Sequence, residues 1–404
     1  MTALYPDFYQ QFHCTADACP ITCCQEWKIS VDDATASKWK TLSVPAEISS
    51  CKTFSRKTSS SLYACTRKQE GSLVITLDED HRCPFLSKNR LCHLVLAYGD
   101  SVLSETCTDF PREFHTFPDH REASLMPCCP AVIDLLCQTK KPVFPDVSSY
   151  DPLFYLRQQC IRLMQDESFL PEEALLSIFY IVTDLSSSAS LNHAYIKDCF
   201  SDLTIAELLP AIRAALPDIT DTIAEDNELL LDLAVNYEKE GLYQNWLAPL
   251  LSDADRLSSG MSLSQPADAD RPLSDLSLSQ PADADQLYSA WEQFLSDLKP
   301  YVPLLRSYLA NEIFSDLLVP CGDLMDTQIR LQWIGLSYAA IRHSLFLQWY
   351  ASPDHTLSYS TVRDSIVYLS RMTGYDDEDV IDYLQNSFAS LTWDWGYFAM
   401  ILAL

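Results

Sequence analysis

The sequence predicts a mainly α-helical protein, in which a small, irregular, cysteine-rich domain with a β-hairpin precedes an α-helical domain. Twelve of the 15 cysteines lie at or before Cys137. Apolar residues recur at steps of three and four in the later part of the chain, which is typical of amphipathic helices. Net charge divides in the same way, at −3 for residues 1–140 and −25 for residues 141–404. The 404-residue chain is long enough for more than one core, so we expect domains at 1–140 and 141–404, joined near Thr139–Pro152.

The first 140 residues show little sustained helical period, but one hairpin is expected. Residues 61–68 and 72–78 are separated by a turn around Gly71. In the second of these segments Leu73, Ile75 and Leu77 alternate with other residues, as in a half-buried strand. The hairpin would deliver the chain to Cys83.

Residues 141–404 contain four apolar stripes with helical spacing. Pro171 followed by two glutamates is a favourable helix start. Such stripes are far more often core than cofactor site. The stripes are Leu175, Ile178, Phe179, Val182 and Leu185; Leu305, Leu309, Ile313 and Leu317; Ile334, Tyr338, Ile341, Leu345 and Trp349; and Val380, Leu384, Phe388 and Leu391.

A 15-residue tandem repeat interrupts the helical region. Its two copies begin at Asp253 and Asp268 and are rich in Ser, Asp and Pro. Two such units cannot bury much apolar surface and fall short of a solenoid. We therefore expect a flexible linker at about 252–286, with a docking role for this acidic loop as the weaker alternative.

Composition excludes several functional classes. The eight glycines are too dispersed for a Rossmann fingerprint, a P-loop or the glycine-rich loop of common nucleotide-binding methyltransferases. A net charge of −28 argues against nucleic-acid binding. No segment has the apolar length of a membrane helix, and the start does not resemble a signal peptide. These features predict a cytoplasmic protein that does not insert into a membrane.

The order of the cysteines carries the strongest chemical signal. In a reducing cytosol, clustered cysteines favour metal or cluster ligation over disulfides. Thiolates suit zinc, copper(I) or an iron–sulfur cluster, and four suffice for one closed site. More than four are present, which indicates two centres or one centre with additional thiols near it. The spacing is Cys14-x4-Cys19-x3-Cys23-Cys24, then Cys83-x8-Cys92, then Cys107, then Cys128-Cys129.

Two segments resemble a known family. The run from Phe12 to Trp27, with Cys14, Cys19 and Cys23-Cys24, resembles the opening of the flagellin lysine-N-methylases. Residues 83–112, including Cys83-Pro-Phe-Leu and Cys107-Thr-Asp-Phe-Pro-Arg, are similar to that family's second cysteine segment. The wider superfamily is named for zinc or iron chelation. The resemblance covers residues 5–130 and extends weakly to residues 308–314.

This resemblance implies transfer of methyl groups from S-adenosylmethionine to lysines of flagellin, with an iron–sulfur cluster, 4Fe–4S in type, as the metal centre and zinc as the alternative metal. It does not choose four ligands among the cysteines that match. Cys128 stands where the family tends to have serine, so Cys129 aligns instead. The matching candidates for metal ligands are Cys14, Cys19, Cys23, Cys24, Cys83, Cys92 and Cys107.

Residues near these cysteines allow both functional and structural interpretations. Trp27 could shield a cluster from water, although a packed core tryptophan is more common. His81 and His93 could be ligands, but hydrogen-bonded or surface histidines are more frequent. Arg112 could offset thiolate charge or hold a carboxylate of S-adenosylmethionine. Six cysteines without partner spacing are interpreted as buried small residues: Cys51, Cys65, Cys137, Cys160, Cys199 and Cys321.

Two further functional hypotheses stay open beside the methyltransferase. In one, the cysteines bind structural zinc and the acidic helices bind a basic partner. In the other, the metal centre senses redox state or iron. The acidic charge of the helical region could attract a lysine-bearing substrate or serve only solubility.

Overall fold

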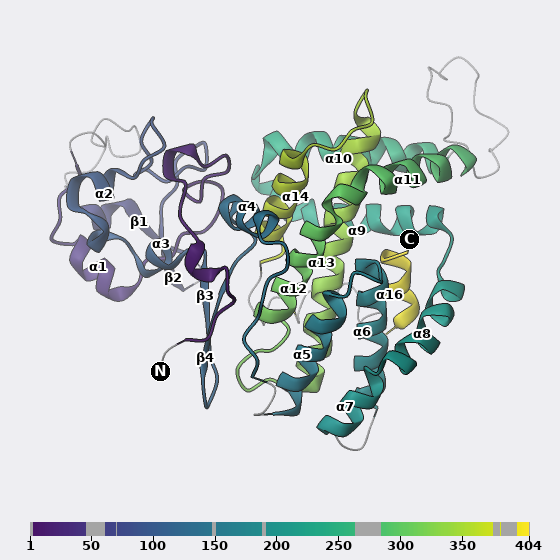
Figure 1. Cartoon of the computed structure of the whole chain (residues 1–404). Helices are drawn as coiled ribbons and strands as arrows, with labels where there is room; N and C mark the ends of the chain where they lie inside the picture. Colours follow the sequence, from purple (N-terminus) through teal and green to yellow (C-terminus); the bar gives the residue numbers. More distant parts are fainter. Residues whose placement is uncertain are drawn as a thin grey trace, which may run out of the picture.

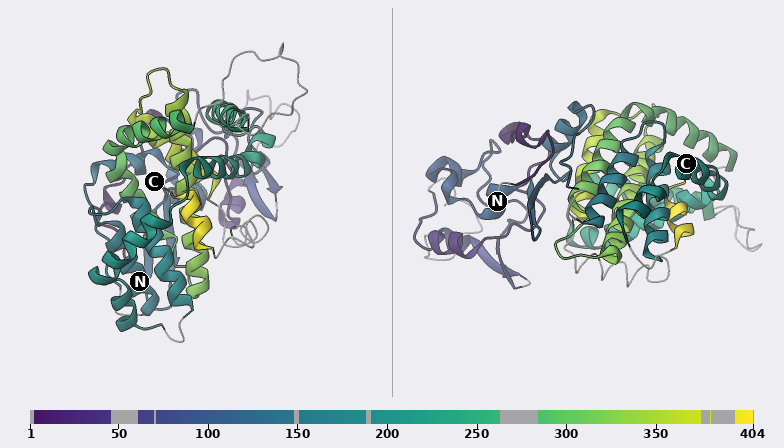
Figure 2. Two further views of the ribbon diagram at one scale, coloured as in Figure 1. Left: turned by 90° about the vertical axis from the view of Figure 1, so that its right-hand side faces the viewer. Right: turned by 60° about the horizontal axis from the view of Figure 1, so that its bottom comes forward.

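The computed structural model describes residues 3–45, 61–69, 71–147, 151–187, 191–262, 284–374, 380 and 394–403. These residues form a cysteine-rich region at one end of the molecule and a helical region at the other, with a β-hairpin between them (Figure 1). The mainly α-helical prediction is confirmed. The right-hand view of Figure 2 shows the same side-by-side arrangement, and in the left-hand view the cysteine-rich region lies behind the helical region.

The cysteine-rich region consists of short elements joined by loops. Its predicted hairpin is confirmed, with antiparallel pairing of Thr66 to Ile75 and Gln69 to Ser72. Asp32 caps the first helix by accepting a hydrogen bond from the Thr35 amide at 2.8 Å. The elements are α1 (Asp33–Trp39), β1 (Thr66–Gln69), β2 (Ser72–Ile75), α2 (His93–Tyr98) and α3 (Glu105–Asp109).

A second antiparallel hairpin follows, and its strands are β3 (Arg112–Thr116) and β4 (Arg121–Leu125). Arg112 lies opposite Leu125 in this pairing. The Leu4 amide donates to the carbonyl oxygen of Arg121 at 2.8 Å, and the Ala123 amide donates to that of Leu4 at 2.8 Å. The start of the chain therefore pairs with β4.

The remaining described elements are helices. One helix ends at Gln138 and the next begins at Pro152, on either side of the predicted junction. The helices are α4 (Pro130–Gln138), α5 (Pro152–Met164), α6 (Pro171–Ser186), α7 (His193–Cys199), α8 (Asp202–Ala215), α9 (Ile219–Glu240), α10 (Gln244–Ser262), α11 (Ala284–Leu298), α12 (Val302–Ser315), α13 (Leu324–Ala351), α14 (Tyr359–Met372) and α16 (Trp395–Ile401).

Helix α13 is the central element of the helical region, and it packs against α6, α9, α10, α11, α12, α14 and α16. Gly335 gives the close approach to α16, because a Cβ there would lie 2.1 Å from the Phe398 ring. Phe398 in turn stacks on Phe179 of α6, with ring centroids 4.1 Å apart. The predicted stripes in α6, α12 and α13 are buried, as is Val380 of the fourth stripe. The rest of the fourth stripe, 384–391, lies outside the described residues.

Polar side chains lie inside this helical core, which the stripe pattern did not predict. Arg342 of α13 is fully buried, 3.5 Å from a Glu172 oxygen and 3.9 Å from an Asp226 oxygen. His343, also fully buried, shares a hydrogen bond with Asn227 at 2.9 Å. These groups meet because α13 is surrounded by helices on every side, so its polar residues need partners within the protein.

Hydrophobic contacts divide the described residues into two main cores. The smaller one lies within residues 29–102 and includes Trp39, Phe85 and Cys83. The larger one fills the helical region and also takes in Phe8, Phe12, Ile21 and residues of α4. The start of the chain and α4 thus pack with the helical region. The division into domains at residue 140 stays a prediction.

The repeat-containing segment lies largely outside the described residues. Its first part, 252–262, continues α10, and residues 284–286 begin α11, so the ends of the predicted linker are helical. Within the described part of the chain, every helix is too short or too polar to cross a bilayer.

Candidate metal centre

Backbone pairing brings the two cysteine segments together. The Cys83 amide donates to the carbonyl oxygen of Cys24 at 2.8 Å, and the Glu26 amide donates to that of His81 at 2.8 Å. Gln25 and Arg82 form an antiparallel bridge between these two contacts. Cys83 is therefore fixed beside the Cys23-Cys24 pair, although about 60 residues separate them in sequence.

Helix ends place the next two cysteines. Cys92 is the residue before the first turn of α2, and the His93 amide donates to the carbonyl oxygen of Phe85 at 2.8 Å. Cys107 lies in α3, where its amide donates to the Ser104 hydroxyl, the cap of that helix, at 3.3 Å. The charges of Cys92 and Cys107 both act on the Cys83 thiol, so the three residues lie near one another.

Five of the seven predicted ligands form one group: Cys23, Cys24, Cys83, Cys92 and Cys107. The Cys83 thiol is close enough to Cys107, Cys92 and Cys23 for their charges to raise its pKa. Cys24 is affected by Cys23, Cys83 and Cys92 in the same way. We call these five residues the thiol group.

Burial gives the thiol group its acid–base character. It raises the pKa of Cys83 well above the usual value, and raises that of Cys107 to about 11. Without a metal these thiols hold their protons at neutral pH, and metal binding would displace them.

Cys23 is the exception within the thiol group. A hydrogen bond from the Cys24 thiol and the nearby charge of Arg371 lower the pKa of Cys23 to about 7, against the opposing effect of burial. The same hydrogen bond raises the pKa of Cys24, since Cys24 keeps the proton that the pair shares. Cys23 is thus the first of the two to become a thiolate.

Cys14 and Cys19 lie beside the thiol group. Cys19 interacts electrostatically with Cys23 and Cys14, and its thiol donates to the carbonyl oxygen of Ile21 at 3.2 Å. Cys14 is exposed. Cys129, buried in the helical core, is affected by the charges of Cys19 and Cys23. Cys23 therefore connects the thiol group to a second set of cysteines.

Arg371 of α14 is the residue of the helical region that holds the cysteine segment in place. Its guanidinium donates to the carbonyl oxygens of Ile21 at 3.3 Å, Thr22 at 3.2 Å and Cys128 at 3.1 Å. It also lies over the Trp27 ring, 5.6 Å from its centroid. Arg371 is only 7% exposed, so its charge acts in a poorly solvated place.

Helices α9 and α10 contribute a second contact at this junction. The amide of Tyr243, between these helices, donates to a Glu26 carboxylate oxygen at 3.1 Å. The Tyr243 ring packs against Tyr368 of α14, and Tyr368 stacks on Trp246. Glu26, two residues after the Cys23-Cys24 pair, therefore contacts an aromatic group supplied by the helical region.

Several single-residue predictions can now be assessed. Trp27 is half-buried; its indole donates to the carbonyl oxygen of Cys23 at 2.8 Å and its ring meets Phe110 edge-on. Arg112 lies over the Phe12 ring, 5.2 Å from its centroid, and the cation beside Cys23 is Arg371. His81 lies near Gly241, with Nε2 3.8 Å from the Cβ position there, and His93 opens α2.

The interpretation of unpaired cysteines as buried residues was partly wrong. Cys65 and Cys160 are buried, as predicted. Cys137 and Cys321 are exposed, because they lie at the end of α4 and after α12 rather than on an inward face. Cys199 is half-buried, and Cys51 lies outside the described residues.

Arg371 was the important residue that sequence reasoning missed. It lies 349 and 350 positions from the carbonyl groups of Thr22 and Ile21 and 243 from that of Cys128, and no spacing rule connects an arginine on a helix to loops so far away. The only signal was its place beside an apolar helical face.

Cavities also occur away from the thiol group in the described structure. One, of about 480 Å³, is lined by residues of the junction, α6, α11 and α12, including Arg306 and Lys299. Its volume is in the range of small-molecule sites. Its lining contains no cysteine, so it is separate from the thiol group.

The sequence was compared with known proteins. A family model described as the FliB lysine N-methylase C-terminal domain matches residues 157–401. The chain is 26% identical over 262 residues to a lysine-N-methylase of Salmonella typhimurium (strain LT2), and 24% identical over 262 residues to one of Salmonella choleraesuis. Each alignment covers 59% of this chain and 61% of the relative, so this chain spans about three-fifths of their length.

A shorter relative is the flagellar biosynthetic protein FliU of Salmonella muenchen. It is 27% identical over 143 residues, which cover 33% of this chain and 75% of that protein. No solved structure matches the sequence.

Proposed function

Because the chain belongs to the FliB lysine N-methylase family, we propose that it is a protein lysine N-methyltransferase that uses S-adenosylmethionine and acts on flagellin. The printed names of its relatives, lysine-N-methylase and a flagellar biosynthetic protein, support the reaction and the substrate. The observation that carries the proposal is the thiol group, placed against Arg371 of the family-defining helical region.

We propose further that the thiol group holds an iron–sulfur cluster, 4Fe–4S in type. Four of its five sulfurs suffice for such a cluster, and thiolates are its usual ligands. Cys83, Cys92 and Cys107 come from separate elements, and either Cys23 or Cys24 would complete the set. Cys23 is favoured as the fourth ligand, since Arg371 and Cys24 already stabilise its thiolate form.

Sulfur spacing supports a cluster over a single zinc ion. In a tetrahedral zinc site with Zn–S bonds of about 2.3 Å, the sulfurs lie about 3.8 Å apart. Among the described residues, no three cysteine sulfurs lie within 4.8 Å of one another. A cluster of several atoms needs wider spacing than one ion does.

The chain's own residues would serve the cluster in definable ways. Trp27 and Phe110 pack together next to Cys23 and restrict water there. Arg371 offsets the negative charge of the thiolates. A cluster would supply a Lewis-acidic iron or a rigid support for the loops. Methylation itself needs a neutral lysine amine aligned with the sulfonium methyl.

Intact-mass measurement of flagellin tests the activity. Flagellin co-expressed with this chain should gain 14 Da increments on lysines, and flagellin expressed alone should not. The Cys83→Ser and Cys107→Ser variants should lose the increments, whereas Cys137→Ser, an exposed cysteine outside the thiol group, should keep them. Unmodified flagellin in the presence of folded wild-type chain would overturn the proposed activity.

Anaerobic purification tests the cofactor independently. A brown protein that absorbs near 400 nm and contains about four iron and four sulfide per chain is expected. A colourless protein with one zinc per chain would overturn the cluster and favour the metal-stabilised binding protein.

A further inference from the structure

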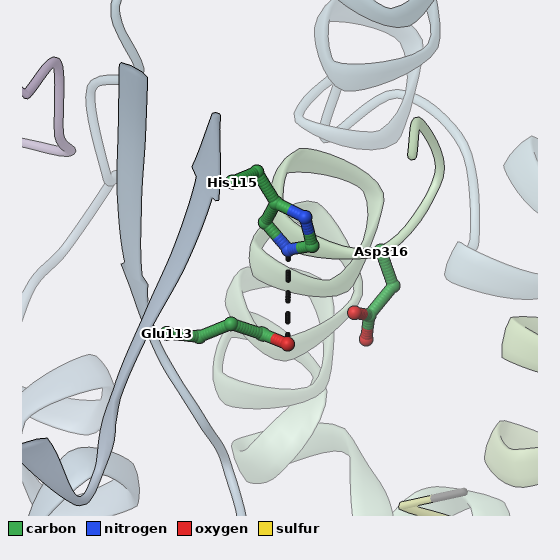
Figure 3. A group of neighbouring side chains, drawn as sticks. All are labelled: Glu113, His115 and Asp316. Carbon is green, nitrogen blue, oxygen red and sulfur yellow. Dashed lines mark ion pairs between the residues drawn. The ribbon is translucent and has the colours of Figure 1, made fainter. Parts of the chain in front are cut away.

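A second candidate site lies between the β3–β4 hairpin and the end of α12. Glu113 and His115 are two residues apart on β3, so their side chains point to the same face of the hairpin. Asp316 follows the last residue of α12. Figure 3 shows the three side chains turned toward one another across this interface.

The ligand atoms of these residues are close together. One atom from each lies within 4.8 Å of the others, and His115 Nε2 is 3.7 Å from a Glu113 carboxylate oxygen. Metal–ligand bonds of about 2.1 Å place neighbouring ligand atoms about 3.0 to 3.4 Å apart. Small side-chain rotations would therefore bring the three atoms to bonding distance of one ion.

A third carboxylate lies beside them. Glu312 is one helical turn before Asp316 on α12 and is 9% exposed. Burial and the charges of Asp316 and Glu113 raise the pKa of Glu312 well above its usual value. Burial, with the charge of Glu113, raises the pKa of Asp316 to about 7, while Arg330 of α13 acts in the opposite direction. The carboxyl groups of Glu113, Glu312 and Asp316 therefore lie close enough to affect one another's pKa.

The neighbouring acid, Glu122, is already engaged. It lies opposite His115 in the hairpin, and both of its oxygens accept hydrogen bonds from Arg157, at 2.6 and 2.8 Å. Its contact with His120 is 3.1 Å. Arg157 therefore pairs with Glu122, and the other carboxyl groups of this interface are those of Glu113, Glu312 and Asp316.

Ser124 gives an independent sign that a ligand belongs here. It lies opposite Glu113 in the hairpin register, so both side chains are on the same face. Ser124 is 1% exposed, and its hydroxyl oxygen has no hydrogen-bond partner among the described residues. His115 Nε2 is also buried, and the Glu113 oxygen 3.7 Å away lies beyond hydrogen-bond distance. Leaving such groups unpaired costs about 1–3 kcal/mol each.

We propose that this interface binds a divalent transition-metal ion of the Mn²⁺, Fe²⁺ or Zn²⁺ type, with Glu113, His115 and Asp316 as ligands. The Ser124 hydroxyl would bond to a water or carboxylate of the coordination sphere. One imidazole with several carboxylates is a nitrogen–oxygen donor set that suits these ions. The ion would tie the hairpin, and with it the start of the chain, to α12.

This site is chemically distinct from the thiol group, and that difference determines the experiment. Mn²⁺ favours oxygen and nitrogen ligands over thiolates. Bound Mn²⁺ therefore measures occupancy of the site formed by Glu113, His115 and Asp316, without binding to the cysteines. Full-length chain treated with a chelator would be titrated with Mn²⁺, and bound ion followed by electron paramagnetic resonance. One Mn²⁺ per chain is expected, with nitrogen coupling from a single imidazole.

Two variants and one control test the assignment. His115→Ala should abolish the nitrogen coupling, and Asp316→Asn, of almost unchanged shape, should weaken Mn²⁺ binding at least tenfold. His355→Ala removes an exposed histidine after α13 and should leave both unchanged. Circular dichroism would establish that each variant is folded.

Three results would overturn the proposed site: no Mn²⁺ bound at millimolar concentration, binding unaffected by Asp316→Asn, or bound Mn²⁺ without imidazole coupling in the wild-type chain. None of these results depends on methylation activity. The site and the proposed enzyme can therefore fail separately.

Discussion

The two ends of the molecule are stabilised in different ways. Between residues 29 and 102 the small core contains 11 buried apolar residues in the described part of the chain, held by short helices and a hairpin of two four-residue strands. In the helical region, the 28-residue α13 is surrounded by other helices over almost its whole length. A small core of this kind usually needs a metal or disulfides to be stable, whereas a large helical core does not.

This difference predicts where a bound cofactor would contribute to folding. In the cysteine-rich region, three members of the thiol group come from different loops or short helices, so one bound cluster would connect elements that otherwise share few contacts. In the helical region, buried ion pairs such as that of Arg342 with Glu172 provide polar specificity without a metal. Arg371 joins the two regions.

The largest expected effect is from Cys83→Ser. Cys83 is buried and central to the thiol group, so the variant should lose bound metal and local order together. Hydrogen exchange should show loss of protection over about residues 24–107, with α6, α12 and α13 still protected. Cys137→Ser is the matched control and should exchange like the wild type. Equal loss of protection in both regions would show that the helical region also depends on the metal centre, contrary to the difference described above.

The next largest effect is expected from Arg342→Met in the helical region. The variant leaves Glu172 and Asp226 as buried acids without their shared cation, which should lower the free energy of unfolding by about 3–5 kcal/mol. Urea denaturation followed by helical circular dichroism measures this. Metal content should not change in the fraction that folds. A parallel loss of iron would contradict the idea that the helical region and the cysteine-rich region are stabilised independently.

A smaller effect is expected from Arg371→Ala at the junction. The variant loses three hydrogen bonds to carbonyl oxygens, for a cost of roughly 2–3 kcal/mol. It also removes a charge that lowers the pKa of Cys23, so this pKa should rise. The rate of iodoacetamide alkylation against pH in metal-free protein measures the shift. Arg371→Lys keeps the positive charge and should show a smaller rise in the pKa of Cys23. An unchanged alkylation–pH profile in Arg371→Ala would exclude the electrostatic role of Arg371.

The last effect is a pH dependence confined to the helical region, and it is absent near neutral pH. Burial and the neighbouring charge of Arg342 lower the pKa of His343 to about 3, below the value of about 6.5 in an unfolded chain. Below pH 6.5 this histidine therefore binds a proton in the unfolded state, whereas in the folded state it stays neutral until the pH approaches 3. Stability should fall by up to about 1.4 kcal/mol for each pH unit between about 6 and 4 from this group.

His343→Gln tests this assignment, since glutamine can still donate to Asn227 but does not titrate. The variant should show a shallower decline of unfolding free energy over that pH range than the wild type. Identical slopes would mean that His343 does not account for the acid sensitivity of the helical region.

Local pattern determined much of this protein. The mainly helical class, the hairpin at 66–75, the start of α6 at Pro171 and the buried faces of α6, α12 and α13 follow from periodicity and from residue-specific preferences, which act over a few positions. The cysteine order identified the family, and the family match over residues 157–401 agrees with it.

Only the tertiary structure decided which residues meet. It brought the five cysteines of the thiol group together, with Cys19 beside Cys23, and it brought Arg371 of α14 to Ile21 and Thr22. It also assembled Glu113, His115 and Asp316 from elements 200 residues apart, where no motif marks them. The physical reason is the same in each case: spacing along the chain governs which face of an element a side chain occupies, whereas packing between elements governs what that face touches.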